Sequence, residues 1–151
     1  MKFSTRIDAE MSAPQLFDKV NDFNRLEQLL IQRGASVSRI DPADEPGTGM
    51  GWNIAFDWRG RERTLRLEVV RYDRPERVIM TGLSEALELS IDSTVIALSQ
   101  TRSRLVYETD IRPRNMRARL MLQTAKLGKA RLDRRFETRI KELVGELGGL
   151  G

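Results

Sequence analysis

Residues Met50–Val70 read MGWNIAFDWRGRERTLRLEVV, and they hold both tryptophans of the chain. Large apolar side chains occupy every second position in the first half of this stretch, at Trp52, Ile54, Phe56 and Trp58. Alternate side chains of a β-strand point to the same face, so the pattern predicts a strand with one apolar face. This face either packs into an ordinary core or lines a space kept open for a ligand.

The stretch continues past a glycine into a second alternating run, so residues 51–59 and 61–72 are predicted to form a β-hairpin. Three further runs of period two follow at residues 77–83, 86–99 and 104–112, with short turn-forming segments between them. Sequential strands joined by short connections form an antiparallel meander. The middle of the chain is therefore predicted to be one antiparallel sheet.

Alternation also predicts which side chains of this sheet point inward, although the direction of Met80 is ambiguous. Inward apolar side chains either fill a packed core or form the wall of a pocket, because both uses require the same residue types. The candidates for a pocket lining from the sheet are Trp52, Ile54, Phe56, Trp58, Leu65, Leu67, Met80, Leu89 and Tyr107.

The N-terminal part of the chain predicts a strand, two short helices and a second strand. Residues 3–11 alternate between apolar and polar side chains, which is typical of a half-buried strand. Ser12 is suited to cap the helix that follows, with Pro14 in its first turn. A second helix is predicted from about residue 24 to 32, and a short strand at 35–40.

One long amphipathic helix is predicted from residue 115 to about 147, a segment without proline. At about 1.5 Å per residue it would be about 50 Å long and would cross the whole domain, which should be about 40 Å wide. Its apolar residues recur every three or four positions and form one stripe. We expect the glycine on this stripe to permit close packing against the sheet, while a hinge or room for a ligand are the alternatives. The candidate pocket-lining residues on the stripe are Met121, Ala125, Gly128 and Leu132.

The sequence contains no histidine and no cysteine. Their absence excludes Ser-His-Asp and Cys-His catalysis, disulfide bonds, and zinc sites built on these residues. No metal site and no cofactor is predicted, and any acid–base chemistry would have to use Asp, Glu, Lys or Tyr. By alternation, the carboxylates of the predicted strands point to the solvent face. Tyr107 points inward and is therefore the best candidate for a hydrogen-bonding or proton-donating group in the interior. No catalytic residue is assigned.

Positive charge is concentrated in one part of the chain. The whole sequence carries +4, but residues 112–141 hold eleven Lys and Arg against two acids, which gives +9 and leaves −5 for the rest. The ordinary interpretation is a solvated face with salt bridges. Nucleic acid is not an expected partner because the segment lacks interleaved aromatic residues and standard reading motifs. Transient contact with anionic lipid headgroups is the alternative.

The predicted order of elements is strand, two short helices, antiparallel strands and one long helix, which indicates the α+β class. Over nearly its whole length the sequence resembles the START/SRPBCC superfamily, whose helix-grip fold includes polyketide cyclase/dehydrase and lipid transport domains. The resemblance implies one domain, 1–151, in which a curved antiparallel sheet of about seven strands wraps around the long C-terminal helix. The motifs that carry it, besides the opening strand and the terminal helix, are SAPQLFD at 12–18, NDF at 21–23 and YDRPERV at 72–78.

The resemblance implies an apolar pocket between the sheet and the long helix. We expect a module that binds or transports a hydrophobic lipid- or polyketide-like molecule; the alternatives are a cyclase- or dehydratase-like enzyme and a protein-interaction domain without ligand. A second apolar set on the helix, Met116, Leu120 and Leu127, fits either the pocket rim or a homodimer or protein partner. No apolar run is long enough to span a membrane and no signal core opens the chain, so a cytoplasmic location is expected.

Overall fold

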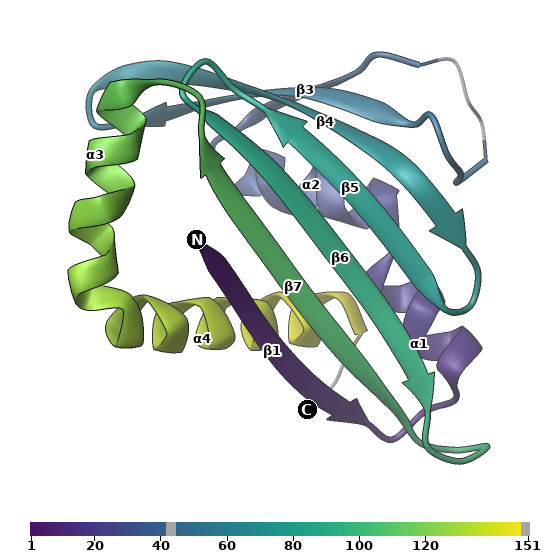
Figure 1. Ribbon diagram of the computed structural model, residues 1–151. Helices are drawn as coiled ribbons and strands as arrows, with labels where there is room; N and C mark the ends of the chain where they lie inside the picture. Colours follow the sequence, from purple (N-terminus) through teal and green to yellow (C-terminus); the bar gives the residue numbers. More distant parts are fainter. Residues whose placement is uncertain (42–44, 149–151) are drawn as a thin grey trace.

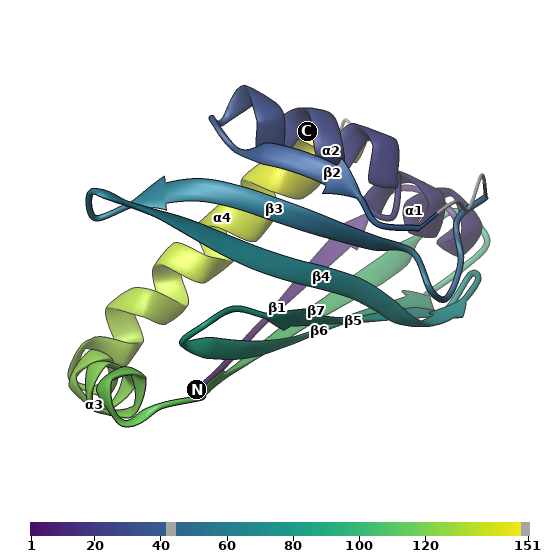
Figure 2. The same cartoon turned by 90° about the horizontal axis from the view of Figure 1, so that it is seen from above.

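The computed structural model describes residues 1–41 and 45–148, which form an antiparallel sheet with helices on one side (Figures 1 and 2). The seven strands of this described part follow the order β1-β7-β6-β5-β4-β3-β2. Strands β2 to β7 are therefore a meander, as the short connections between them predict, and β1 pairs with the last strand, β7. The strands are β1 (Lys2–Ala9), β2 (Ser36–Arg39), β3 (Gly51–Trp58), β4 (Arg61–Asp73), β5 (Arg77–Leu83), β6 (Leu87–Ala97) and β7 (Ser103–Pro113).

Two short helices, α1 (Ala13–Val20) and α2 (Phe23–Gln32), follow β1 as predicted. The Ser12 side chain accepts a hydrogen bond from the backbone N–H of Gln15, whose own side chain accepts from the Ser12 N–H at 3.1 Å. This reciprocal pair satisfies backbone groups that the first helical turn leaves free. Asp22 caps α2 by accepting from the N–H of Arg25 at 3.1 Å.

The C-terminal helical segment begins at residue 116, close to the predicted start, but it is not straight. It consists of α3 (Met116–Ala125), a 3₁₀ turn η1 (Lys126–Gly128) and α4 (Lys129–Gly148). Figure 1 shows α3 and α4 running in clearly different directions. α4 packs against β1 and α1, whereas α3 contacts β7. The expectation of a single straight helix across the molecule is therefore corrected. No helix in the described part of the chain is long and apolar enough to cross a membrane.

Two features of the sequence account for the bend. The hydroxyl of Thr124 donates to the carbonyl oxygen of Leu120 at 3.1 Å, a bond to the preceding turn that often bends helices. Gly128, at the end of the 3₁₀ turn, has low helix propensity. A Cβ atom at Gly128 would meet no heavy atom within 4 Å, and the residue is exposed. The expected close packing of this glycine against the sheet is therefore wrong.

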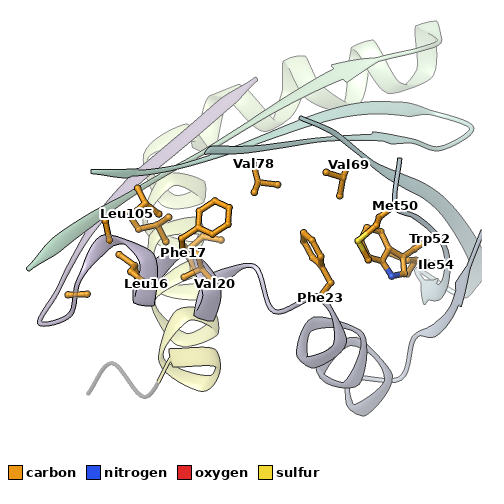
Figure 3. Close-up of a cluster of buried hydrophobic side chains, with 14 residues drawn as sticks. Leu16, Phe17, Val20, Phe23, Met50, Trp52, Ile54, Val69, Val78 and Leu105 are labelled. Atoms are coloured by element: carbon orange, nitrogen blue, oxygen red, sulfur yellow. The ribbon is translucent and has the colours of Figure 1, made fainter. Parts of the chain in front are cut away.

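The core lies between the concave face of the sheet and the helices α1, α2 and α4 (Figures 2 and 3). Leu16 and Phe17 of α1 are completely buried there, and Leu105 of β7 is buried beside them. Further along the sheet, Phe23 of α2 packs on Trp52 of β3 with ring centroids 5.3 Å apart. The core thus has an α1 end and an α2 end, joined along the concave face.

A β-bulge in β4 changes which residues of that strand point inward. The register with β5 shifts between Val69 and Arg71, so one extra residue is inserted at this point. Val69 is fully buried, and the shift brings Tyr72, three positions later, to the same face. The Tyr72 ring contacts Phe17 with centroids 5.4 Å apart. Uniform alternation from residue 61 to 72 could not predict that Tyr72 points inward.

Candidate functional site

A hollow lies between the concave face of the sheet and the helices α2 and α4. It encloses about 450 Å³ when its open mouth is included, of which about 30 Å³ is wide enough for the centre of a water molecule. Strands β5, β6 and β7 supply one wall, and the opposite wall comes from the ends of α1 and α2 and from α4. Its lining residues are Val20, Asn21, Phe23, Leu26, Val78, Met80, Ile91, Ser93, Leu105, Tyr107 and Ile140.

A second hollow adjoins the first beneath α2. It encloses about 270 Å³ with its mouth, again with about 30 Å³ for water centres, and it shares Phe23, Leu26 and Met80 with the first. The shared side chains therefore separate the two hollows. Its remaining lining residues are Glu27, Leu30, Trp52, Ile54 and Leu67.

Each hollow as described is large enough for about two water molecules. A drug-sized ligand needs a site of about 300–1,000 Å³. A larger guest must therefore displace the side chains between the two hollows. Met80 is suited to such a displacement, because methionine is unbranched and adapts its shape to irregular space. Moving Met80 and Phe23 would join the hollows into one elongated site under α2.

Two hydroxyl groups face the first hollow from neighbouring strands. Ser93 of β6 and Tyr107 of β7 are directly opposite each other in the sheet register, and both line the hollow. The Ser93 Oγ is buried and has no hydrogen-bond partner among the described residues. Burial raises the pKa of Tyr107 to about 12, so its hydroxyl stays protonated at neutral pH and can donate a hydrogen bond. Burying a hydroxyl group without a hydrogen-bond partner destabilises the protein. A polar atom of a guest that bonds to the hydroxyl would remove this penalty.

A third polar group of the first hollow is already engaged. The side-chain amide of Asn21, in the connection between α1 and α2, is buried and donates to the carbonyl oxygen of Phe17 at 3.0 Å. This bond holds the connection against the end of α1. The two strand hydroxyls are therefore the polar groups best placed to orient a guest.

A carboxylate lies at the second hollow, where sequence reasoning had considered only the outward carboxylates of the strands. The indole N–H of Trp52 donates to Glu27 Oε1 at 2.6 Å. The guanidinium of Arg39 lies 3.8 Å from the same oxygen and stacks over the Trp52 ring at 5.6 Å. Glu27 belongs to α2, one turn after Phe23, and this helical spacing was the signal available in the sequence.

Five of the thirteen candidate pocket residues lie at the hollows: Trp52, Ile54, Leu67, Met80 and Tyr107. Leu65 and Leu89 are half-buried neighbours of Gly82 on the same face and line neither hollow.

Phe56 and Trp58 lie further along β3, where the exposed fractions of their side chains are 37% and 44%. Arg59 and Arg63 stack over the Trp58 ring at 4.6 and 5.5 Å. The Arg63 Nε is buried and has no hydrogen-bond partner among the described residues. This end of the concave face is thus an arginine–aromatic cluster outside both hollows.

The C-terminal candidates are not at the hollows. Met121 and Ala125 belong to α3, and Gly128 to the 3₁₀ turn, so the bend carries them away from the concave face. Leu132 is half-buried in the first turn of α4. Among the α4 residues whose side chains the structure describes, Ile140 lines the first hollow, two turns further along the predicted stripe. The lining residues from α1 and α2 were not among the candidates, because only strand and C-terminal residues were considered.

No group of three or more acidic side chains in the described ranges 1–41 and 45–148 is arranged to hold a metal ion. Among the described residues, the polar groups at the hollows are two hydroxyls, one amide, one carboxylate and the indole N–H that donates to this carboxylate, on otherwise apolar walls.

No protein-family model matches the sequence, and no curated protein matches it. Solved structures do match over nearly the whole chain. TTHA0849 from Thermus thermophilus is 11% identical with a TM-score of 0.69, covering 97% of each chain. Zhui aromatase/cyclase from a Streptomyces species is 14% identical with a TM-score of 0.66, covering 97% of this chain and 93% of that one.

A START superfamily protein from Mycobacterium smegmatis is 12% identical with a TM-score of 0.57, covering 89% of this chain and 95% of that one. At such low identity these likenesses concern the fold alone. They agree with the observed order of elements, in which a curved antiparallel sheet and two short helices accompany a long C-terminal helical segment. The chain has the START/SRPBCC-type helix-grip fold.

Proposed function

We propose that the protein binds an apolar small molecule in the space between the concave sheet and the helices α2 and α4. The observation that carries this proposal is the buried Ser93 hydroxyl, which has no partner in the described chain and faces a largely apolar hollow. A protein with no use for the hollow would gain stability from an apolar residue at this position. Two structures of the same fold are described as a START superfamily protein and an aromatase/cyclase, which agrees with this class of function.

The lining predicts what the guest is like. Burial of apolar surface supplies most of the affinity, at about 25 cal/mol per Å². The hydroxyls of Ser93 and Tyr107 line the same hollow from directly opposite positions on neighbouring strands, so each can donate to an acceptor oxygen of the guest. The preferred guest is therefore an apolar molecule with a carbonyl or similar acceptor oxygen near one end.

A second candidate is a cyclase-like enzyme acting on such a carbonyl compound. It is favoured by the position of Glu27 and Tyr107 at adjacent hollows that share three lining residues. Joining the hollows would place a hydrogen-bond donor and a carboxylate at two points along one substrate. Tyr107 would stabilise developing negative charge on the carbonyl oxygen, and Glu27 would accept a proton.

A matched pair of ligands tests the binding proposal. Tetralone and tetralin share a bicyclic skeleton, and only tetralone carries a carbonyl oxygen. In a Trp58→Phe variant, Trp52 at the second hollow is the remaining tryptophan of the chain, so its fluorescence reports occupancy. We expect saturable quenching by both compounds, with tetralone bound about fivefold more tightly because of its hydrogen bonds.

Substitutions that remove the two hydroxyl groups separate the contribution of hydrogen bonds to ligand binding from the contribution of apolar burial. Ser93→Ala combined with Tyr107→Phe should abolish the preference for tetralone and leave tetralin binding nearly unchanged. Ser90→Ala is the matched control, since Ser90 is exposed on the opposite face of the same strand. If neither compound quenches Trp52, or if Ser90→Ala has the same effect as the hydroxyl variants, the proposed site is wrong.

A further inference from the structure

Helix α3 and the 3₁₀ turn η1 that follows it present apolar side chains to solvent. The exposed fractions are 65% for Met116, 57% for Leu120 and 89% for Leu127. Met116 and Leu120, four residues apart, lie on one side of α3, and Leu127 follows in η1. The opposite side of α3 is already used, because Ala118 and Leu122 are buried there. A helix with one packing partner does not need a second apolar face.

Unpaired positive charge surrounds these apolar side chains. Residues 112–132 contain seven Lys and Arg and no Asp or Glu, so they carry +7 while the rest of the chain carries −3. Four of these cations, Arg117, Arg119, Lys126 and Arg131, form no ion pair with a described residue. The exposed apolar side chains Met116, Leu120 and Leu127 and these four cations are called the α3 surface below.

The β3–β4 hairpin lies at the same end of the molecule as α3 in both ribbon views (Figures 1 and 2). It carries the partly exposed Trp58, and its residues 57–63 hold three Arg against two acids, a net charge of +1. Trp58 is stacked under Arg59 at 4.6 Å, an arrangement in which an aromatic ring and a cation face solvent together. Apolar and cationic groups are thus combined on both elements.

We propose that the α3 surface docks on an anionic lipid bilayer. Exposed Leu and Met side chains can enter the boundary between headgroups and acyl chains, while the flanking Lys and Arg interact with lipid phosphates and carboxylates. A second copy would bring the same four unpaired cations against one another and is disfavoured by repulsion. A nucleic acid would use the cations and leave the leucines in water. A lipid surface is the partner that uses both sets of side chains.

Sedimentation with lipid vesicles tests this docking. The full chain should bind vesicles of phosphatidylcholine with about 30% phosphatidylserine, should not bind pure phosphatidylcholine, and should be released by salt. Leu127→Ser should lower the partition coefficient about tenfold, since a leucine loses its apolar contact. Arg119→Gln and Lys126→Gln should each lower it about fivefold.

Two controls lie away from the α3 surface. Leu98→Ser removes a leucine with a 42% exposed side chain from the β6–β7 turn, and Arg25→Gln removes an exposed cation from α2. Both should leave vesicle binding unchanged, and Leu127→Ser should leave tetralone binding unchanged, so this proposal and the ligand proposal can fail separately. Equal binding to neutral vesicles, an equal loss in the controls, or binding to duplex DNA that is tighter than to vesicles would overturn the proposal.

Discussion

Tyr107 lies on the inner face of β7 opposite Ser93, where the surrounding walls are mostly apolar. Burial is the sole cause of its raised pKa, so no nearby charge determines its protonation. The hydroxyl therefore remains a donor over the whole physiological pH range. This is the property that a group orienting a carbonyl oxygen requires.

The raised pKa predicts how stability depends on alkaline pH. The pKa of Tyr107 is about 12 in the folded protein against an ordinary value of 10.0, so the unfolded chain loses this proton first. The contribution of Tyr107 is fully present below pH 10.0 and is lost as the pH rises through about 12. It corresponds to about 2–3 kcal/mol of unfolding free energy.

Urea unfolding near neutral pH and near pH 12 measures this loss. Tyr107→Phe should lose less stability between the two conditions than the native protein. Tyr72 and the basic side chains titrate in both proteins and cancel in the comparison. An equal loss in both would show that Tyr107 is not buried from solvent.

The inward direction of Ser93 and Tyr107 could be predicted from the sequence, because β6 and β7 pair without a register shift and keep the two-residue alternation throughout. The inward position of Tyr72 could not, since it follows from one extra residue in β4. Glu27 could not be placed either, because its contact with Trp52 joins a helix to a strand 25 positions away. Local pattern determines the face, and long-range packing determines the neighbours.

At the scale of elements, the bend between α3 and α4 decides which helical residues reach the hollow. Ile140 of the predicted apolar stripe lines the hollow, whereas Gly128 of the same stripe is exposed. The stripe shows which face of a helix is apolar, but it contains no information on whether the helix axis bends. The direction of α3 depends on Thr124, on the 3₁₀ turn and on packing against β7.

Gly128 provides a stability prediction for this bend. A Cβ atom would meet nothing within 4 Å and the backbone is not in the left-handed region, so Gly128→Ala should raise the free energy of unfolding by about 0.5–1 kcal/mol. Chemical denaturation measures the change. Gly82→Ala is the contrasting control: its Cβ would lie 3.3 Å from the Cβ of Leu89, which the strand backbone holds in place, so this substitution should not stabilise the protein. Destabilisation by Gly128→Ala would contradict the described geometry of the bend.

At the scale of the whole molecule, the hollows arise because a curved sheet is covered by separate helices instead of one continuous layer. α1 and α4 cover the β1–β7–β6 part and α2 lies over the β2–β3 end, so the first hollow remains where the two coverings meet. The order of elements and the antiparallel sheet could be predicted from the sequence. The volume between the layers could not, because it depends on how every facing side chain packs.

Filling the hollow should abolish binding while the fold is retained. Ile91→Phe adds volume to a lining position on β6, and Ile96→Phe adds the same volume at a 44% exposed position on the outer face of that strand. We expect Ile91→Phe to lose tetralone binding with a stability change of less than about 1.5 kcal/mol, since the hollow accepts part of the ring. Fluorescence titration and urea unfolding measure both quantities. Tight binding by Ile91→Phe would place the guest elsewhere.

The position of a bound guest is the most direct test of the account. Intermolecular nuclear Overhauser effects between tetralone and the protein methyl groups locate the ligand in solution. The account predicts contacts to Met80, Ile91 and Ile140, which come from two strands and α4 around one hollow. Contacts confined to exposed residues such as Leu127 or Ile96, with none to these three, would contradict it.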